Sequence, residues 1–119
     1  MLTGLANPIS VLQKYDAFVD ENWFIGNSDL GGLPEAAYLG LCIAGEASEI
    51  SEKLKKAYRD NGGKVNVVLM AKEIGDILYY LTRYAHLLGY DLEGIARMNV
   101  EKIESRKERG KLRGEGDDR

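Results

Sequence analysis

The chain repeats its apolar residues every three or four positions along two long segments, and this pattern constrains the fold most. The repeat covers residues 34–58 and 65–88. The face is formed in the first segment by Leu39, Ile43, Ile50 and Leu54, and in the second by Met70, Ile77, Leu81 and Leu88. Residues at this spacing share one side of an α-helix. No segment alternates strictly as a half-buried strand does. The pattern therefore predicts two long helices packed against each other.

Two shorter helices flank this pair. The segment ANPISVLQKYDAFVDENW predicts a first helix, with Asn7 as its N-cap and Pro8 at the first helical position. Asp91 is placed to cap a fourth helix that reaches about Arg109. The glycines and polar residues of FIGNSDLGGLP predict a loop before Pro34, which begins the second helix. The expected fold is all-α and four-helix bundle-like, with two long central helices.

Glycines mark the predicted ends of the second and third helices. RDNGG ends the second helix and Gly89 ends the third, because glycine accepts the positive φ that follows many helices. VNVVLM (65–70) is β-like in composition but continues into the third apolar stripe, so it is predicted to be helical. A length of 119 residues predicts a single domain. Its expected parts are an N-terminal helix and loop (1–33), the core helices (34–110) and a flexible glycine-rich tail (111–119).

Charge and composition restrict the possible partners and compartment. A formal net charge of -3 argues against a general nucleic-acid coat. No apolar stretch approaches the roughly 20 residues that span a bilayer, and the N-terminus does not resemble a signal peptide. Cys42 is the only cysteine, so neither an internal disulfide nor a cysteine-built zinc site is available. We expect a cytoplasmic protein that binds neither membrane nor nucleic acid.

Three acids lie at the edge of the two apolar faces, and a fourth, Glu49, lies about 60° further out. Glu46 and Glu49 are three residues apart on the second segment, and Glu73 and Asp76 repeat that spacing on the third. If the faces pack together, the two pairs meet, and unit charges about 4 Å apart repel by roughly 4 kcal/mol at an effective dielectric near 20. Protonation or a bound cation must compensate. Oxygen-only ligands suit Mg²⁺ or Mn²⁺, and Mg²⁺ is commonly completed by substrate phosphates.

Two other interpretations of the acids compete with a Mg²⁺ site. They could be rim charges of amphipathic helices, paired with Lys53, Lys56 or Lys72. A di-iron bundle needs two Glu-x-x-His motifs. The only histidine, His86, is preceded at that spacing by Arg83, so the di-iron alternative fails.

The segments GEASEISEKLKK and KEIGDILYYL together resemble the E-x-x-E and E-x-x-D signature of the MazG-like nucleoside triphosphate pyrophosphohydrolases. The similarity continues through LGYDLEGIARMNVEKIESRKERG to RGEGDDR, from about residue 33 to the end. It implies a Mg²⁺-dependent, all-α, oligomeric enzyme (a dimer or a dimer of dimers). Such enzymes convert a nucleoside triphosphate to the monophosphate and pyrophosphate, and the role that the resemblance implies here is control of the nucleotide pool. The implied metal ligands are Glu46, Glu49, Glu73 and Asp76, binding two or more ions, with Mn²⁺ as a substitute.

The resemblance also implies roles for other residues. Glu46 or Glu49 would orient or deprotonate the attacking water. Asn99, Lys102 and Arg106 share one helical face and match the family's phosphate contacts. Tyr80 follows Asp76 by four residues, where relatives place an aromatic beside the nucleobase, and Trp23 could stack on the base. Plainer roles remain open for these three: a surface arginine at 106, a core tyrosine at 80 and a loop anchor at 23.

Two further classes of function compete with the enzyme. The first is a catalytically silent module of the same fold that binds nucleotide or metal and acts in regulation. The second is a helical assembly protein whose acids are only rim charges. Metal-dependent stabilisation separates the assembly protein from the other two, and turnover of a triphosphate separates the enzyme from the silent module.

Overall fold

The computed structural model describes residues 10–26, 29–114 and 116, and within them it contains four α-helices and no strand. The helices are α1 (Val11–Glu21), α2 (Glu35–Asp60), α3 (Val67–Leu87) and α4 (Leu92–Glu108). The all-α fold with two long helices is therefore confirmed. Across the described part of the chain, no helix is long and apolar enough to cross a membrane.

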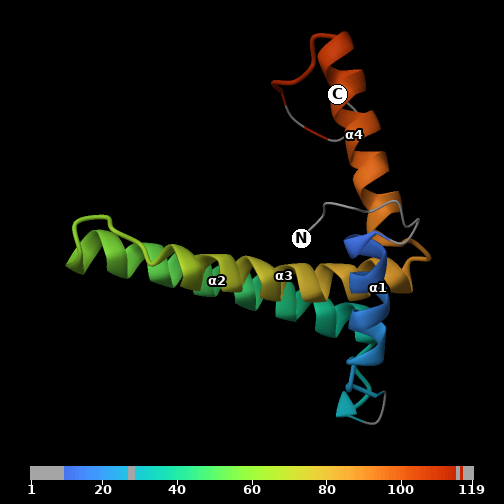
Figure 1. Ribbon diagram of the computed structural model, residues 1–119, viewed down its shortest axis with the longest axis horizontal. Coiled ribbons are helices and arrows are strands. Elements are labelled where there is room, and N and C mark those ends of the chain that lie inside the picture. Colours follow the sequence, from blue (N-terminus) through green and yellow to red (C-terminus); the bar gives the residue numbers. More distant parts are fainter. Residues whose placement is uncertain (1–9, 27–28, 115, 117–119) are drawn as a thin grey trace.

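The two long helices, α2 and α3, lie side by side as an antiparallel hairpin (Figure 1). Gly62 and Gly63 follow α2 with φ of 60° and 83°, so the predicted glycine stop is confirmed. The prediction that α3 begins at Val65 was wrong by two residues. Val65 lies in the connection and Asn66 caps the helix, its side chain accepting a hydrogen bond from the Leu69 amide at 3.1 Å. The asparagine cap thus fixes the start of α3.

The short helices begin at side-chain caps. Ser10 caps α1 in a capping box, in which Ser10 and Gln13 each accept a hydrogen bond from the other's backbone amide. The helix therefore starts at Val11, three residues after the predicted start; Asn7 and Pro8 lie outside the described residues. At α4 the predicted cap is confirmed, because the Asp91 carboxylate accepts from the Gly94 amide at 2.8 Å.

The short helices meet the pair only near the end opposite its hairpin tip. There α1 crosses the pair, and α4 leaves it and projects away (Figure 1). The radius of gyration is 17.7 Å, whereas a compact chain of this length has about 13–14 Å. The buried residues among those described are Val19, Leu39, Ala57, Thr82, Ala85 and Arg106. The chain is an open assembly of helices around a small core.

The predicted apolar faces are only partly covered. Leu39 of α2 is fully buried, but Leu54, Leu81 and Leu88 remain exposed. Exposed apolar residues occur on more than one side of α3, but four of them and the C-cap residue Leu88 fall within roughly 80° on a helical wheel. They are Val67, Ile74, Leu78, Leu81 and Leu88. A continuous apolar strip of α3 is therefore uncovered in the single chain.

Candidate metal centre

Three of the four predicted acids meet between the long helices. Glu46 of α2 and Glu73 and Asp76 of α3 each offer a carboxylate oxygen, and these three oxygens lie within 4.8 Å of one another. The three-residue spacing on α3 places both of its acids on the side that faces α2. Glu46 and Glu73 are partly buried, while Asp76 is exposed. Two neighbouring helices thus hold a compact set of oxygen donors.

The negative charges at this cluster act on one another. Burial raises the pKa of Glu46, and a hydrogen bond with Glu73 and the charges of Asp76, Glu73 and Glu49 raise it further. Glu49 is exposed and lies outside the group of three, although its charge is felt at Glu46. A carboxyl group with a raised pKa holds a proton in place of a missing positive charge. The cluster therefore favours a cation.

Lys53 is the nearest cationic partner of the cluster that the structure shows. Its ammonium lies 3.4 Å from a Glu73 oxygen. This is the kind of acid–lysine pair that the rim-charge interpretation expects for Lys53. One lysine does not balance four carboxylates, so an excess of negative charge remains. Hard oxygen donors, partial burial and uncompensated negative charge together fit Mg²⁺ or Mn²⁺. The residues present thus suit the metal implied by the sequence.

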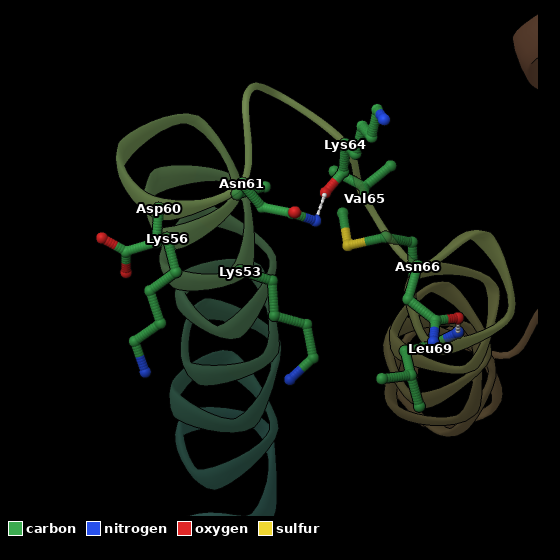
Figure 2. Close-up of a pocket in the computed structure, with 10 residues that line it drawn as sticks. Lys53, Lys56, Asp60, Asn61, Lys64, Val65, Asn66 and Leu69 are labelled. Carbon is green, nitrogen blue, oxygen red and sulfur yellow. Dashed lines mark hydrogen bonds between the residues drawn. The ribbon is translucent and has the colours of Figure 1, made fainter.

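Lys53 also borders a hollow of about 380 Å³ at the tip of the hairpin. Figure 2 shows Lys53, Lys56 and Lys64 around it, with the Asn61 side-chain amide donating to the Lys64 carbonyl at 3.1 Å. Asp60 is the one acid in the lining, and it is paired with Arg59 at 2.7 Å. The tip is thus a basic region joined to the acid cluster through Lys53.

Tyr80 lies beside the acids, one turn further along α3. Burial raises the pKa of its hydroxyl, and so do nearby Cys42 and Tyr38 and the charges of Glu46 and Asp76. Its ring meets Tyr79 and Trp23 edge-on, at centroid distances of 5.5 and 6.4 Å. An aromatic group therefore adjoins the cluster on the side of α1.

Trp23 is fixed in place by polar contacts. Its indole N–H donates to Glu35 at 3.0 Å, and the Arg83 guanidinium lies over the ring, 5.3 Å from the centroid. The polar edge and part of one face are thereby occupied within the chain. These contacts favour the role of loop anchor, while Tyr80 remains the aromatic side chain nearest the acids.

The predicted phosphate-binding residues of α4 do not reach the acid cluster of their own chain. Asn99 and Lys102 line an apolar groove of about 570 Å³ between α1, α3 and α4, together with Leu78. Leu78 lies roughly 160° around α3 from Asp76, because successive helical residues turn by about 100°. The groove and the acid cluster therefore occupy nearly opposite sides of α3.

Arg106 is buried and not on the surface. It is 7% exposed, and its guanidinium donates to the carbonyl of Gly116 at 3.4 Å. The backbone amide of Lys111 donates to the Arg106 carbonyl at 2.6 Å. In the described residues the end of the chain, without regular secondary structure, thus packs on α4 at Arg106. Of the three predicted phosphate contacts, Arg106 is thus the one in contact with Lys111 and Gly116.

The sequence patterns did not predict a charged network that lies near the end of the α2–α3 pair. His86 contacts Asp16 and Asp20 of α1, and Arg83 contacts Asp20 and Glu35. The only signal was spacing: the two aspartates are four apart on one predicted helix, and the two basic residues are three apart on another. That spacing places each pair on one face, but it does not say which faces meet.

The comparisons with known proteins agree with this geometry. Residues 35–110 match the MazG nucleotide pyrophosphohydrolase domain, which covers α2, α3 and α4. The chain is also 34% identical over 97 residues to the "Gene 37 protein" of Mycobacterium phage L5, covering 79% of this chain and 85% of that protein. No solved structure matches significantly. The helix pair with its carboxylates lies within the matched region, and the chain belongs to the MazG nucleotide pyrophosphohydrolase family.

Proposed function

We propose that the protein is a Mg²⁺-dependent hydrolase that converts a nucleoside or deoxynucleoside triphosphate to the monophosphate and pyrophosphate. The observation that carries this proposal is the group of Glu46, Glu73 and Asp76, whose oxygens lie within 4.8 Å of one another. Membership in the MazG family supports the same reaction. Control of the nucleotide pool is the role that suits such an activity.

Each acid has a role in this reaction. Glu46, Glu73 and Asp76 would hold the metal, and Glu49 would act from its exposed position outside this group. Mg²⁺, when bound, supplies positive charge for the phosphate oxygens and acidifies a water, commonly as a pair of ions. Glu49 is our first choice for the carboxylate that orients the water and accepts its proton, because it lies outside the group of three. Glu46 is the second choice.

The aromatic side chains suggest where the base lies. Tyr80 adjoins the acids and presents a ring to that side of the cluster. A base stacked on Tyr80 would leave its phosphates directed at the carboxylates. Trp23 would support Tyr80 from the edge, consistent with their 6.4 Å contact.

We further propose that two chains combine to form each complete site. Asn99 and Lys102 border an exposed apolar groove on the side of α3 away from their own acids. The exposed strip of α3 and the large radius of gyration leave apolar surface that a second copy would cover. In such a homodimer, α4 of one chain would offer its phosphate-binding residues to the acids of the other.

The activity is tested by incubating the protein with each common NTP and dNTP, with Mg²⁺, Mn²⁺ or chelator, and separating the products. Metal-dependent release of monophosphate and pyrophosphate is expected, and Glu73→Gln should abolish it. Glu93→Gln is the matched control, because Glu93 is an exposed acid of α4 paired only with Arg97 in the contacts the structure gives. If metal binds but no triphosphate is hydrolysed, a nucleotide- or metal-binding regulatory module replaces the enzyme.

The shared site is tested by complementation. Glu73→Gln and Lys102→Ala proteins, each inactive alone, are mixed after partial denaturation and refolded together. If the site combines two chains, mixed dimers carry one site with both residues intact, and activity returns to about a quarter of the wild-type value at equal mixing. Light scattering before and after mixing reports the mass relative to the 13.2 kDa chain. Activity that never returns in proven mixed dimers would place both residues in one chain's site.

A further inference from the structure

His86 lies between two carboxylates, and the geometry fixes its protonation state. Its Nε2 is 2.6 Å from Asp16 Oδ1 and its Nδ1 is 2.8 Å from Asp20 Oδ1. A neutral imidazole has one donor nitrogen and one acceptor nitrogen, and carboxylates only accept. Both contacts are hydrogen bonds only when the ring is an imidazolium. Because the His86 and Asp16 side chains are each 14% exposed, little water is available to replace the bond between them, whereas Asp20 is half exposed.

Asp16 joins this ring to the start of α4. The backbone N–H of Leu92, the first residue of α4, donates to Asp16 at 3.2 Å from Oδ1 and 3.4 Å from Oδ2. Asp16 Oδ1 therefore accepts from both His86 and α4. A carboxylate at this position also interacts favourably with the positive end of the α4 dipole. The chain His86–Asp16–Leu92 connects α3, α1 and α4 at one point.

The direction of α4 depends on its first turn, because the helix then projects away from the pair (Figure 1). At 1.5 Å per residue, Lys102 lies about 15 Å from Leu92 along the axis. A tilt of about 10° at the start would therefore move Lys102 by roughly 2–3 Å. A displacement of that size breaks a hydrogen bond to a phosphate. Contacts at Leu92 thus control side chains far along the helix.

The charges around His86 come from every helix that meets there. Asp16 and Asp20 face the ring from α1, and Arg83, one turn earlier on α3, contacts Asp20 at 2.8 Å. Glu35 of α2 contacts Arg83 at 3.4 Å. On the side of α4, the Leu92 amide is the one contact that the structure shows for Asp16 among the described residues. Three acids therefore surround two bases, and loss of the His86 proton leaves Arg83 alone against them.

We propose that His86, held as an imidazolium between Asp16 and Asp20, is a positioning residue that sets the direction of α4 through Asp16. The inference extends the proposed function, since α4 carries Asn99 and Lys102. At lower pH the three-way contact is complete, and substrate meets α4 in its working position. When the ring loses its proton, one carboxylate faces a lone pair, the contact weakens, and substrate binding weakens with it.

The direction of the pH effect follows from the folded environment. Burial lowers the pKa of His86, but the hydrogen bonds to Asp16 and Asp20 and their charges outweigh it, so its pKa lies above the ordinary value of about 6.5. The contact therefore stabilises the fold fully below about pH 6.5 and is lost as pH rises through the folded pKa. KM should rise over the same interval, with kcat changed less.

The first experiment uses wild-type protein and NMR. His86 is the only histidine, so its ring resonances titrate without overlap from another. The ring is expected to titrate at higher pH than in the urea-unfolded chain, and the Leu92 amide shift should follow the same midpoint. The Gly94 amide is an internal control, because it is bound to Asp91 and not to the network. The proposal would be overturned if the His86 ring titrated at or below the pH found for the unfolded chain, or if the Leu92 amide shift did not change over the pH range in which the ring titrates.

The second experiment measures kinetics for wild type, His86→Gln and Asp16→Asn with the preferred triphosphate. Wild-type KM is expected to rise several-fold across the His86 titration, while both variants show a raised, flat KM over that interval. A wild-type KM profile retained in His86→Gln would contradict the assignment. The NMR experiment requires no substrate, so failure of the proposed reaction and failure of the positioning role are distinguished.

Discussion

At the scale of single residues, replacing any acid of the cluster by a neutral side chain changes the charge of the site. Replacement of Glu73 by Gln removes one charge and keeps the shape. Mg²⁺ at about 100 times its Kd should stabilise the wild type by about 2.7 kcal/mol. In Glu73→Gln most of that stabilisation should be lost. Thermal melts with and without Mg²⁺ measure it, with Glu93→Gln expected to behave as wild type.

Glu49 has a different expected phenotype, because it lies outside the group of three oxygens. Glu49→Gln should lower kcat by about 100-fold or more, in the range of a lost general base. The stabilisation by Mg²⁺ should largely remain. Parallel measurement of turnover and melting temperature checks both parts. Equal loss of metal stabilisation in Glu49→Gln and Glu73→Gln would instead make Glu49 a ligand.

The sequence predicted the acids but not the partners of His86, for a physical reason. Glu73 and Asp76 are neighbours on one helix, and their spacing alone fixes their relation. Glu46 joined them because two long apolar faces have few ways to pack. Asp16 and His86 are 70 residues apart. Their contact depends on where a short helix crosses the pair, which local spacing does not determine.

At the scale of elements, helix starts are set by side-chain caps. Asn66→Ala removes the acceptor of the Leu69 amide and should destabilise the fold by about 0.5–2 kcal/mol. Asn66→Asp keeps the acceptor and serves as the matched control. Urea denaturation of both variants checks the difference. Equal stability of Asn66→Ala and wild type would show that the cap adds nothing to α3.

Element bounds were predicted best where one strong signal acted alone. Asp91 and the glycines after α2 are such signals, and both are confirmed. The start of α3 was misplaced because Val65 continues the apolar pattern, whereas the next residue, Asn66, caps the helix and so fixes its first residue at Val67. Ser10 was likewise overlooked because Asn7 and Pro8 form a strong starting pattern of their own.

At the scale of the whole molecule, one charged network joins α1, α2 and α3 and reaches the start of α4. The sign of its pH dependence follows from two shifts. The pKa of Asp20 is lowered by hydrogen bonds and charge from His86 and Arg83, against an opposing effect of burial. That contribution is present above about pH 4 and is lost in acid. The His86 contribution is present below about pH 6.5 and is lost as pH rises through its raised pKa.

The melting temperature of the wild type relative to His86→Gln should therefore be greatest between these limits. The two proteins should converge at higher pH, above the folded pKa of His86. Calorimetric scans of both proteins across the range measure the difference, which cancels the titration of groups that they share. A constant difference at all pH values would mean that only the size of the side chain matters.

Helix content and the hairpin followed from local pattern, but the placement of α1 and α4 did not. Their few contacts with the pair include charged pairs whose partners come from distant segments. The exposed strip on α3 likewise follows from that placement. A prediction built from helical faces alone treats every apolar face as buried, as it did for Leu81 and Leu88.

The anchoring of Trp23 has a practical consequence. It is the only tryptophan, and it lies where the loop before α2, Glu35 of α2 and Arg83 of α3 meet. Its fluorescence therefore reports on this single junction. Separation of the loop from the helices would expose the indole to water and shift its emission to longer wavelength. The chain thus carries a built-in optical probe of whether its helices are docked, which requires no added label.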